Sequence, residues 1–188
     1  QQSTSIITMG HEVPDSSHGI KNLIVNNSYG VVLSKTTHVF NKLDLQTGVL
    51  TSGSTNMPVL SDSAIITGGS ASTFISGPIK KYGNTAITFP IGKSGRYAQC
   101  GITNVSGSSN YYFILEYFPQ SPSNPTSLGG SLSSGRISSV EYWRIIGSHN
   151  QRAQVNLFWE NGSYSGITTT SGTDLVVAGF NGSTWISY

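Results

Sequence analysis

The chain has 188 residues, a formal net charge of +2 and only 10% charged residues, where a globular domain typically has about a quarter. So small a net charge does not imply a nucleic-acid partner, and the 10% of aromatic residues argues against a disordered chain. The single cysteine, Cys100, excludes an intramolecular disulfide and a multi-cysteine metal site, so we expect a buried, small apolar residue there.

Serine, threonine, asparagine and glycine stand in place of the missing charges. They favour turns and strands, because their side chains compete with helical backbone hydrogen bonds or add backbone entropy. No apolar run approaches the roughly 18 residues of a membrane-spanning helix. We therefore expect an all-β protein with no nucleic-acid partner and no membrane insertion. The opening Gln1-Gln2 suits a mature N-terminus left after signal-peptide cleavage, which indicates an extracellular protein.

The first 19 residues contain one expected strand, Ser5–Met9, followed by a polar loop. The loop holds four candidate metal ligands: His11, Glu12, Asp15 and His18. Pro14 interrupts any helix, and Asp15 stands where the zinc-protease motif HExxH requires its second histidine. We interpret this segment as a solvated loop and predict no metal site.

From Ile20 the chain repeats itself imperfectly. Leu23-Ile24-Val25-Asn26 is echoed 20 residues later by Leu43-Asp44-Leu45-Gln46, and Val31-Val32-Leu33-Ser34 is echoed 18 residues later by Val49-Leu50-Thr51-Ser52. Short strands at this interval are typical of the coils of a parallel β-solenoid. An antiparallel meander remains the alternative, because the repeat drifts.

A third pass of the repeat contains Val59-Leu60 and Ile65-Ile66-Thr67 and ends at Gly68-Gly69. So few coils need a cap at each end. We expect the N-terminal strand to cap one end and the second half of the chain to cap the other. The sequence thus predicts two domains, residues 1–77 with the solenoid and residues 78–188 with a different β-module.

The second half reads as an antiparallel β-sandwich. Strands are expected at Thr85–Pro90 and Ala98–Asn104, around the turn Gly92-Lys93-Ser94-Gly95. Tyr111–Phe118 is apolar on both faces and predicts a central strand, and the Pro-, Ser- and Gly-rich residues 119–137 predict a long loop. Further strands are expected at Ser139–Ile146, Gln154–Glu160 and Leu175–Phe180, with hairpin turns at Asn161-Gly162 and Asn181-Gly182.

These segments together resemble the repetitive surface proteins of Bacteroidetes that are exported by the type IX secretion system. The first half is similar to their solenoid repeat in KNLIVNNSYGVVLS, KLDLQTGVLTSGS and AIITGGSAS. The segment TFISGPIKKYGNTAITFPIGKSGRYAQCGI resembles their linker, and EYWRI, VNLFWE and DLVVAGFNGSTW resemble their β-sandwich module. The resemblance spans roughly residues 20–188.

The resemblance implies a non-catalytic, extracellular or cell-surface, adhesin-type structural protein. Family modules continue past the strand at Trp185, whereas this chain stops at Tyr188, so we expect a fragment or a sandwich that lacks one strand. Such an edge could accept a strand from another chain, with self-association into a filament or binding of other surface proteins as the outcome. The candidate strand donor is the run from Ser3 to Met9, which contains Ser5, Ile6, Ile7 and Met9 and could act inside the same molecule or from the next one. Ser63 in Asp62-Ser63-Ala64 resembles an O-glycosylation acceptor of this phylum.

Two other function classes depend on individual residues. An enzyme would need converging acid and base groups, and the second half offers only Glu116, Glu141, Glu160 and Asp174. We expect no enzyme and no cofactor. A carbohydrate-binding module is the alternative, with polysaccharide as the partner, and it would need exposed aromatic rings. The candidate ligand-stacking residues are Tyr82, Tyr112, Tyr164 and Trp185.

Overall fold

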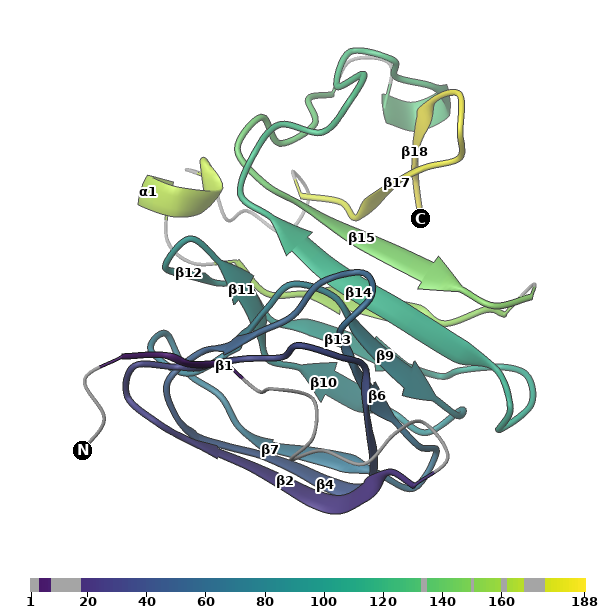
Figure 1. Ribbon diagram of the computed structural model, residues 1–188. Helices are drawn as coiled ribbons and strands as arrows, with labels where there is room; N and C mark the ends of the chain where they lie inside the picture. Colours follow the sequence, from purple (N-terminus) through teal and green to yellow (C-terminus); the bar gives the residue numbers. More distant parts are fainter. Residues whose placement is uncertain (1–3, 8–17, 133–134, 150, 160–161, 168–174) are drawn as a thin grey trace. The chain divides into compact units, whose positions relative to one another are not determined.

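A computed structural model of the chain describes residues 4–7, 18–132, 135–149, 151–159, 162–167 and 175–188. The described part is nearly all β, with one turn of α-helix, α1 (Gly162–Ser165), and one 3₁₀ turn, η1 (Gly130–Leu132), so the predicted fold class is confirmed. Figure 1 shows these elements along the chain. The chain forms two compact units, which we call unit 1 (residues 1–117 and 143–158) and unit 2 (residues 118–142 and 159–188).

Unit 1 begins as a parallel β-solenoid. One wall consists of five parallel strands, β1 (Ile6–Ile7), β3 (Val31–Val32), β5 (Leu50–Thr51), β8 (Ile75–Ser76) and β11 (Ile91–Lys93). The strand β12 (Arg96–Tyr97) ends this wall in an antiparallel hairpin with β11. Leu50, Ile75 and Ile91 share one register position and are fully buried, so each coil adds one apolar side chain to a continuous column.

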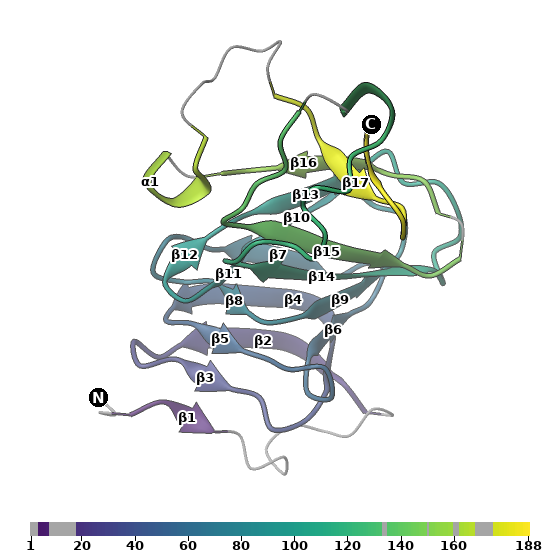
Figure 2. The same cartoon turned by 90° about the horizontal axis from the view of Figure 1, so that it is seen from above.

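The second wall contains β2 (Ile20–Asn26), β4 (Thr37–Thr47), β6 (Pro58–Leu60), β7 (Ile65–Gly68) and β9 (Ile79–Tyr82). All pairs within it are parallel. The long strand β4 pairs with β6 through its first residues and with β7 through its later ones. Figure 2 shows the coils of unit 1 stacked one on another.

The strand register tests the predicted repeats directly. Leu23 faces Leu43 and Val25 faces Leu45, so the 20-residue echo is confirmed as strand pairing up to Val25; a register shift then places Asn26 beside Thr47 and not Gln46. The 18-residue echo is wrong by one residue, because Val31 faces Leu50. Alternation gives the reason, since an 18-residue register would place the buried Leu50 beside Val32, which lies on the opposite face of the sheet.

The parallel ladders continue past Gly68-Gly69, where the sequence suggests that the repeat ends. In the first wall Ile75 faces Ile91, and in the second wall Leu60 faces Lys81. The predicted domain boundary at residues 77/78 therefore lies within unit 1, where both of these ladders cross it.

The antiparallel strands of unit 1 extend the solenoid. β14 (Tyr112–Phe118) pairs with β9, and β15 (Tyr142–Gly147) follows β14 in the same seven-stranded sheet. A separate sheet contains β10 (Ile87–Phe89), β13 (Cys100–Thr103) and β16 (Gln154–Leu157). The inner faces of both sheets share one hydrophobic core with the solenoid coils. Cys100 is fully buried in this core, as predicted.

Local turn chemistry accounts for two hairpins. Ser94 and Gly95 both have positive φ, 54° and 75°, which is the geometry of a two-residue hairpin turn, and they join β11 to β12. In unit 2, β17 (Ala178–Phe180) pairs with β18 (Trp185–Ser187) around Asn181-Gly182, as predicted. The hairpin predicted at Asn161-Gly162 is wrong, because Gly162 begins α1; Asn161 lies outside the described residues.

Candidate functional site

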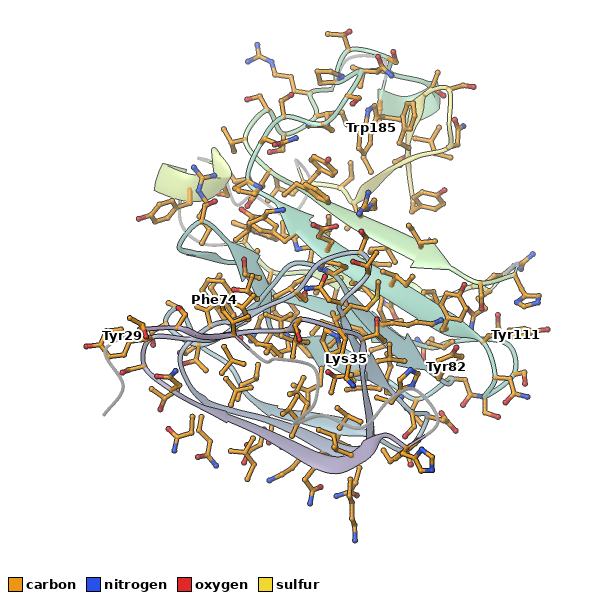
Figure 3. The ribbon with its side chains drawn as sticks, in the orientation of Figure 1. Tyr29, Lys35, Phe74, Tyr82, Tyr111 and Trp185 are labelled. Atoms are coloured by element: carbon orange, nitrogen blue, oxygen red, sulfur yellow. The ribbon has the colours of Figure 1, made fainter. Side chains whose placement is uncertain are left out.

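Two of the four predicted stacking residues come together on one face of unit 1. Tyr82 on β9 (Figure 3) faces Tyr112 on β14, and their rings meet edge to face with centroids 5.4 Å apart. The ammonium of Lys80 lies 3.6 Å from the Tyr112 centroid and 4.6 Å from that of Tyr82. All three side chains are half-buried. The cluster is thus a cation–π arrangement whose rings already have partners within the chain.

A second aromatic contact flanks this cluster and was not foreseen from the sequence. The ring of Tyr111 stacks on the imidazole of His149, with centroids 4.2 Å apart and planes 13° apart. Nearby, the Ser148 backbone N–H donates to the Tyr112 carbonyl, which ties the ends of the two strands together. No local pattern announces a contact between residues 38 positions apart, so only the pairing of the strands reveals it.

The other two predicted stacking residues lie in unit 2. The indole N–H of Trp185 donates to the Asn124 carbonyl at 3.1 Å, and its ring lies 5.4 Å from that of Phe180. Trp185 therefore holds the β17–β18 hairpin against a loop of unit 2. Tyr164 lies on α1 and is exposed. The structure thus brings two of the four candidates, Tyr82 and Tyr112, into contact, whereas Trp185 packs within unit 2.

Two of the four candidate carboxylates, Glu116 and Glu141, lie in the described part of the chain. Glu116 on β14 accepts hydrogen bonds from Lys93 at 3.3 Å and Arg144 at 2.5 Å. A largely buried carboxylate held by two cations is typical of a structural ion pair. Glu141 is 5% exposed in unit 2, while Glu160 and Asp174 lie outside the described residues.

Metal-ligating groups do not cluster among the residues that the structure describes. His11, Glu12 and Asp15 lie outside those residues, and His18 is exposed. In the described ranges, no helix is long and apolar enough to cross a membrane.

Ser63, the O-glycosylation candidate, is exposed on the turn between β6 and β7. Its hydroxyl donates to the Phe40 carbonyl at 3.3 Å, and the neighbouring Ala64 is buried. The turn therefore presents the serine to solvent while Ala64 anchors it.

The same turn is clamped by a buried lysine that sequence reasoning missed. Lys81 is 3% exposed and occupies the inward register position of Leu60. Its ammonium donates to the carbonyls of Asp62 at 2.7 Å and Tyr82 at 2.6 Å. Burial lowers the Lys81 pKa, and the Asp62 carboxylate partly opposes this effect. Successive side chains of the strand IKKY point to opposite faces, so one of its two lysines must face inward. This alternation is the only signal of the clamp in the sequence.

The candidate strand donor lies at the first coil. Ile6 and Ile7 of β1 pair with Val31 and Val32 of the same chain, and the Ser5 hydroxyl donates to the Tyr29 carbonyl at 2.5 Å. Met9 lies outside the described residues. The N-terminal strand therefore takes up the capping position expected for it at one end of the solenoid.

At the opposite end of unit 1, both sheets end in an edge strand. Among the described strands, β15 is the last of the seven-stranded sheet and β16 the last of the three-stranded sheet. Their core-facing side chains are only half-buried; these are Trp143, Ile145, Val155 and Leu157. One strand further in, Cys100 and Ile102 face Leu157 and Val155 and are almost completely buried.

Comparison with protein-family models, with curated proteins and with solved structures finds no match for this chain.

Proposed function

We propose that this chain is a non-catalytic structural segment of an extracellular, adhesin-type surface protein. The observation that carries the proposal is the unbroken packing of unit 1, in which the column Leu50, Ile75 and Ile91 joins the antiparallel sheets in one hydrophobic core. A solenoid that shares its core with its cap is well suited to serve as a stiff spacer, because no coil can move without its neighbours.

The polar groups of unit 1 support the same role. Glu116 is held between two cations, and Lys81 is held by two backbone carbonyls. On the outer face of the solenoid the Asp44 carboxylate accepts hydrogen bonds from Thr67, Lys42 and Gln46, and so links β4 to β7. These groups bind elements of the fold to one another. A low content of charged side chains is also compatible with a secreted surface protein.

Limited digestion with trypsin tests the structural role. Lys42 on β4 and Lys80 and Lys81 on β9 are cleavage sites inside the coils. We expect these bonds to be cut at least about 100-fold more slowly in the folded protein than in urea, because cleavage requires the coil to open. The Ile75→Ala variant, which weakens the same core, is the matched control and should be cut faster. Equal cleavage rates with and without urea would contradict a stiff spacer.

Carbohydrate binding is the second candidate function, and the pairing of Tyr82 with Tyr112 beside Lys80 favours it. A sugar would have to displace the Lys80 ammonium from the ring faces, which weakens this candidate relative to the first. A glycan array tests it. Binding that is lost in Tyr112→Ala and kept in Tyr29→Ala, a control at an exposed tyrosine on another part of unit 1 (Figure 3), would support the site. An array without any signal would remove this candidate.

A further inference from the structure

Both ends of unit 1 terminate in strand edges, but the edge strands differ in how they pair and in how far their apolar side chains are buried. At one end, β1 is the last described strand of its wall and pairs through only two residues. Ile7 is 63% exposed there. At the other end, β15 and β16 leave a half-buried strip of core, and Figure 2 shows these strands at the far end of the stack from β1.

The strip at β16 has the properties of a strand acceptor. Val155 and Leu157 face Ile102 and Cys100 across the β13–β16 ladder, yet they are only half-buried where their partners are covered. On the side of β16 away from β13, no described strand lies beside its backbone. An added strand would satisfy these backbone groups and cover the apolar side chains at the same time.

The N-terminal strand has the properties of a donor. Ser5-Ile6-Ile7 is short and ends in two apolar residues, and when it leaves its own chain it gives up the pairing of Ile6 with Val31 and Ile7 with Val32 and the hydrogen bond from Ser5 to the Tyr29 carbonyl. Its own acceptor edge lies at the far end of the stack, beyond every intervening coil. The donor that reaches the β16 edge must therefore come from a second copy.

We propose that the N-terminal strand of one copy adds to the β16 edge of the next copy, so that the protein assembles head to tail. Such a contact joins two different surfaces, and it propagates into a filament unless the rotation between copies closes a ring. The inference rests on the proposed structural role. It can fail separately, because a monomer can still be a stiff, protease-resistant spacer.

The first test is the assembly state of the full chain by light scattering and negative-stain imaging over a range of concentrations. We expect the full chain to form oligomers or filaments. A chain lacking residues 1–9 should not form them at the same concentrations, and any association of the shortened chain should need at least a tenfold higher concentration. A chain that stays monomeric at all concentrations overturns the proposal. The same result is expected if another protein, or a further segment of a longer chain, fills the edge, and it then excludes a second copy as the occupant.

Disulfide trapping identifies the contact without relying on variants that could unfold. Two variants with one added cysteine each, Ile7→Cys and Val155→Cys, are mixed and oxidised; the native Cys100 is fully buried and stays out of the reaction. We expect a covalent heterodimer at least tenfold above the control pair Ile24→Cys with Val155→Cys, since Ile24 is also exposed but lies on β2. Equal trapping in both pairs, or trapping of Ile7→Cys only with itself, overturns the assignment of donor and acceptor.

Discussion

Replacing Ile75 by alanine probes the column on which the solenoid depends. Ile75 is fully buried and lies in register between Leu50 and Ile91. Isoleucine-to-alanine changes in cores cost about 2–5 kcal/mol, with larger values where the neighbours cannot collapse into the cavity. Backbone ladders hold both neighbours of Ile75 in place, so we expect a loss of about 3–4 kcal/mol in the free energy of unfolding.

Ile65 supplies the matched control for this measurement. It is the same residue type on β7 of the second wall, but it is 54% exposed, so Ile65→Ala should cost less than about 1 kcal/mol. In urea unfolding followed by tryptophan fluorescence, the Ile75→Ala loss corresponds to a midpoint lower by about 1–2 M for a typical slope. If the two variants lose equal stability, the column does not lie in the core and the fold as described is wrong.

Three further predictions concern titrating groups. The hydrogen bond from Thr67, with smaller contributions from Gln46 and Lys42, lowers the pKa of Asp44 from 3.8 to about 2. The free energy of unfolding therefore falls as the pH drops from 3.8 to about 2, and acid unfolding of Asp44→Asn should show a smaller loss of stability than that of the unaltered protein. Burial raises the pKa of Cys100 from 9.0 to about 12, so the unfolded chain releases its proton first and stability falls as pH rises through that range. Urea unfolding of Cys100→Ala should show a shallower decline, and an unchanged decline would contradict the assignment. Burial lowers the pKa of Lys81 in the folded protein below 10.5, so its contribution to stability increases as the pH rises from that lowered pKa towards 10.5. Lys81→Met should lack this increase, which is measured as the difference between the urea unfolding curves of the variant and the unaltered protein.

Features set by neighbouring residues could be predicted from the sequence. The all-β class follows from composition and short strand patterns. The pairing of Leu23 with Leu43 follows from the repeat, because a parallel coil places equivalent residues side by side. The hairpin at Asn181-Gly182 follows from turn chemistry, since Gly182 adopts the positive φ, 100°, that the turn requires.

Features set by partners distant in the sequence could not be predicted in this way. The register of Val31 depends on which face of β5 is buried. Lys81 faces inward because β9 pairs with β6 and places Lys81 beside Leu60. The contact of Tyr82 with Tyr112, and the half-buried strip at Val155, exist only because β9, β14, β13 and β16 pair as they do. Such pairings are chosen by the total packing of the core, a sum over many residues that no short stretch of sequence contains.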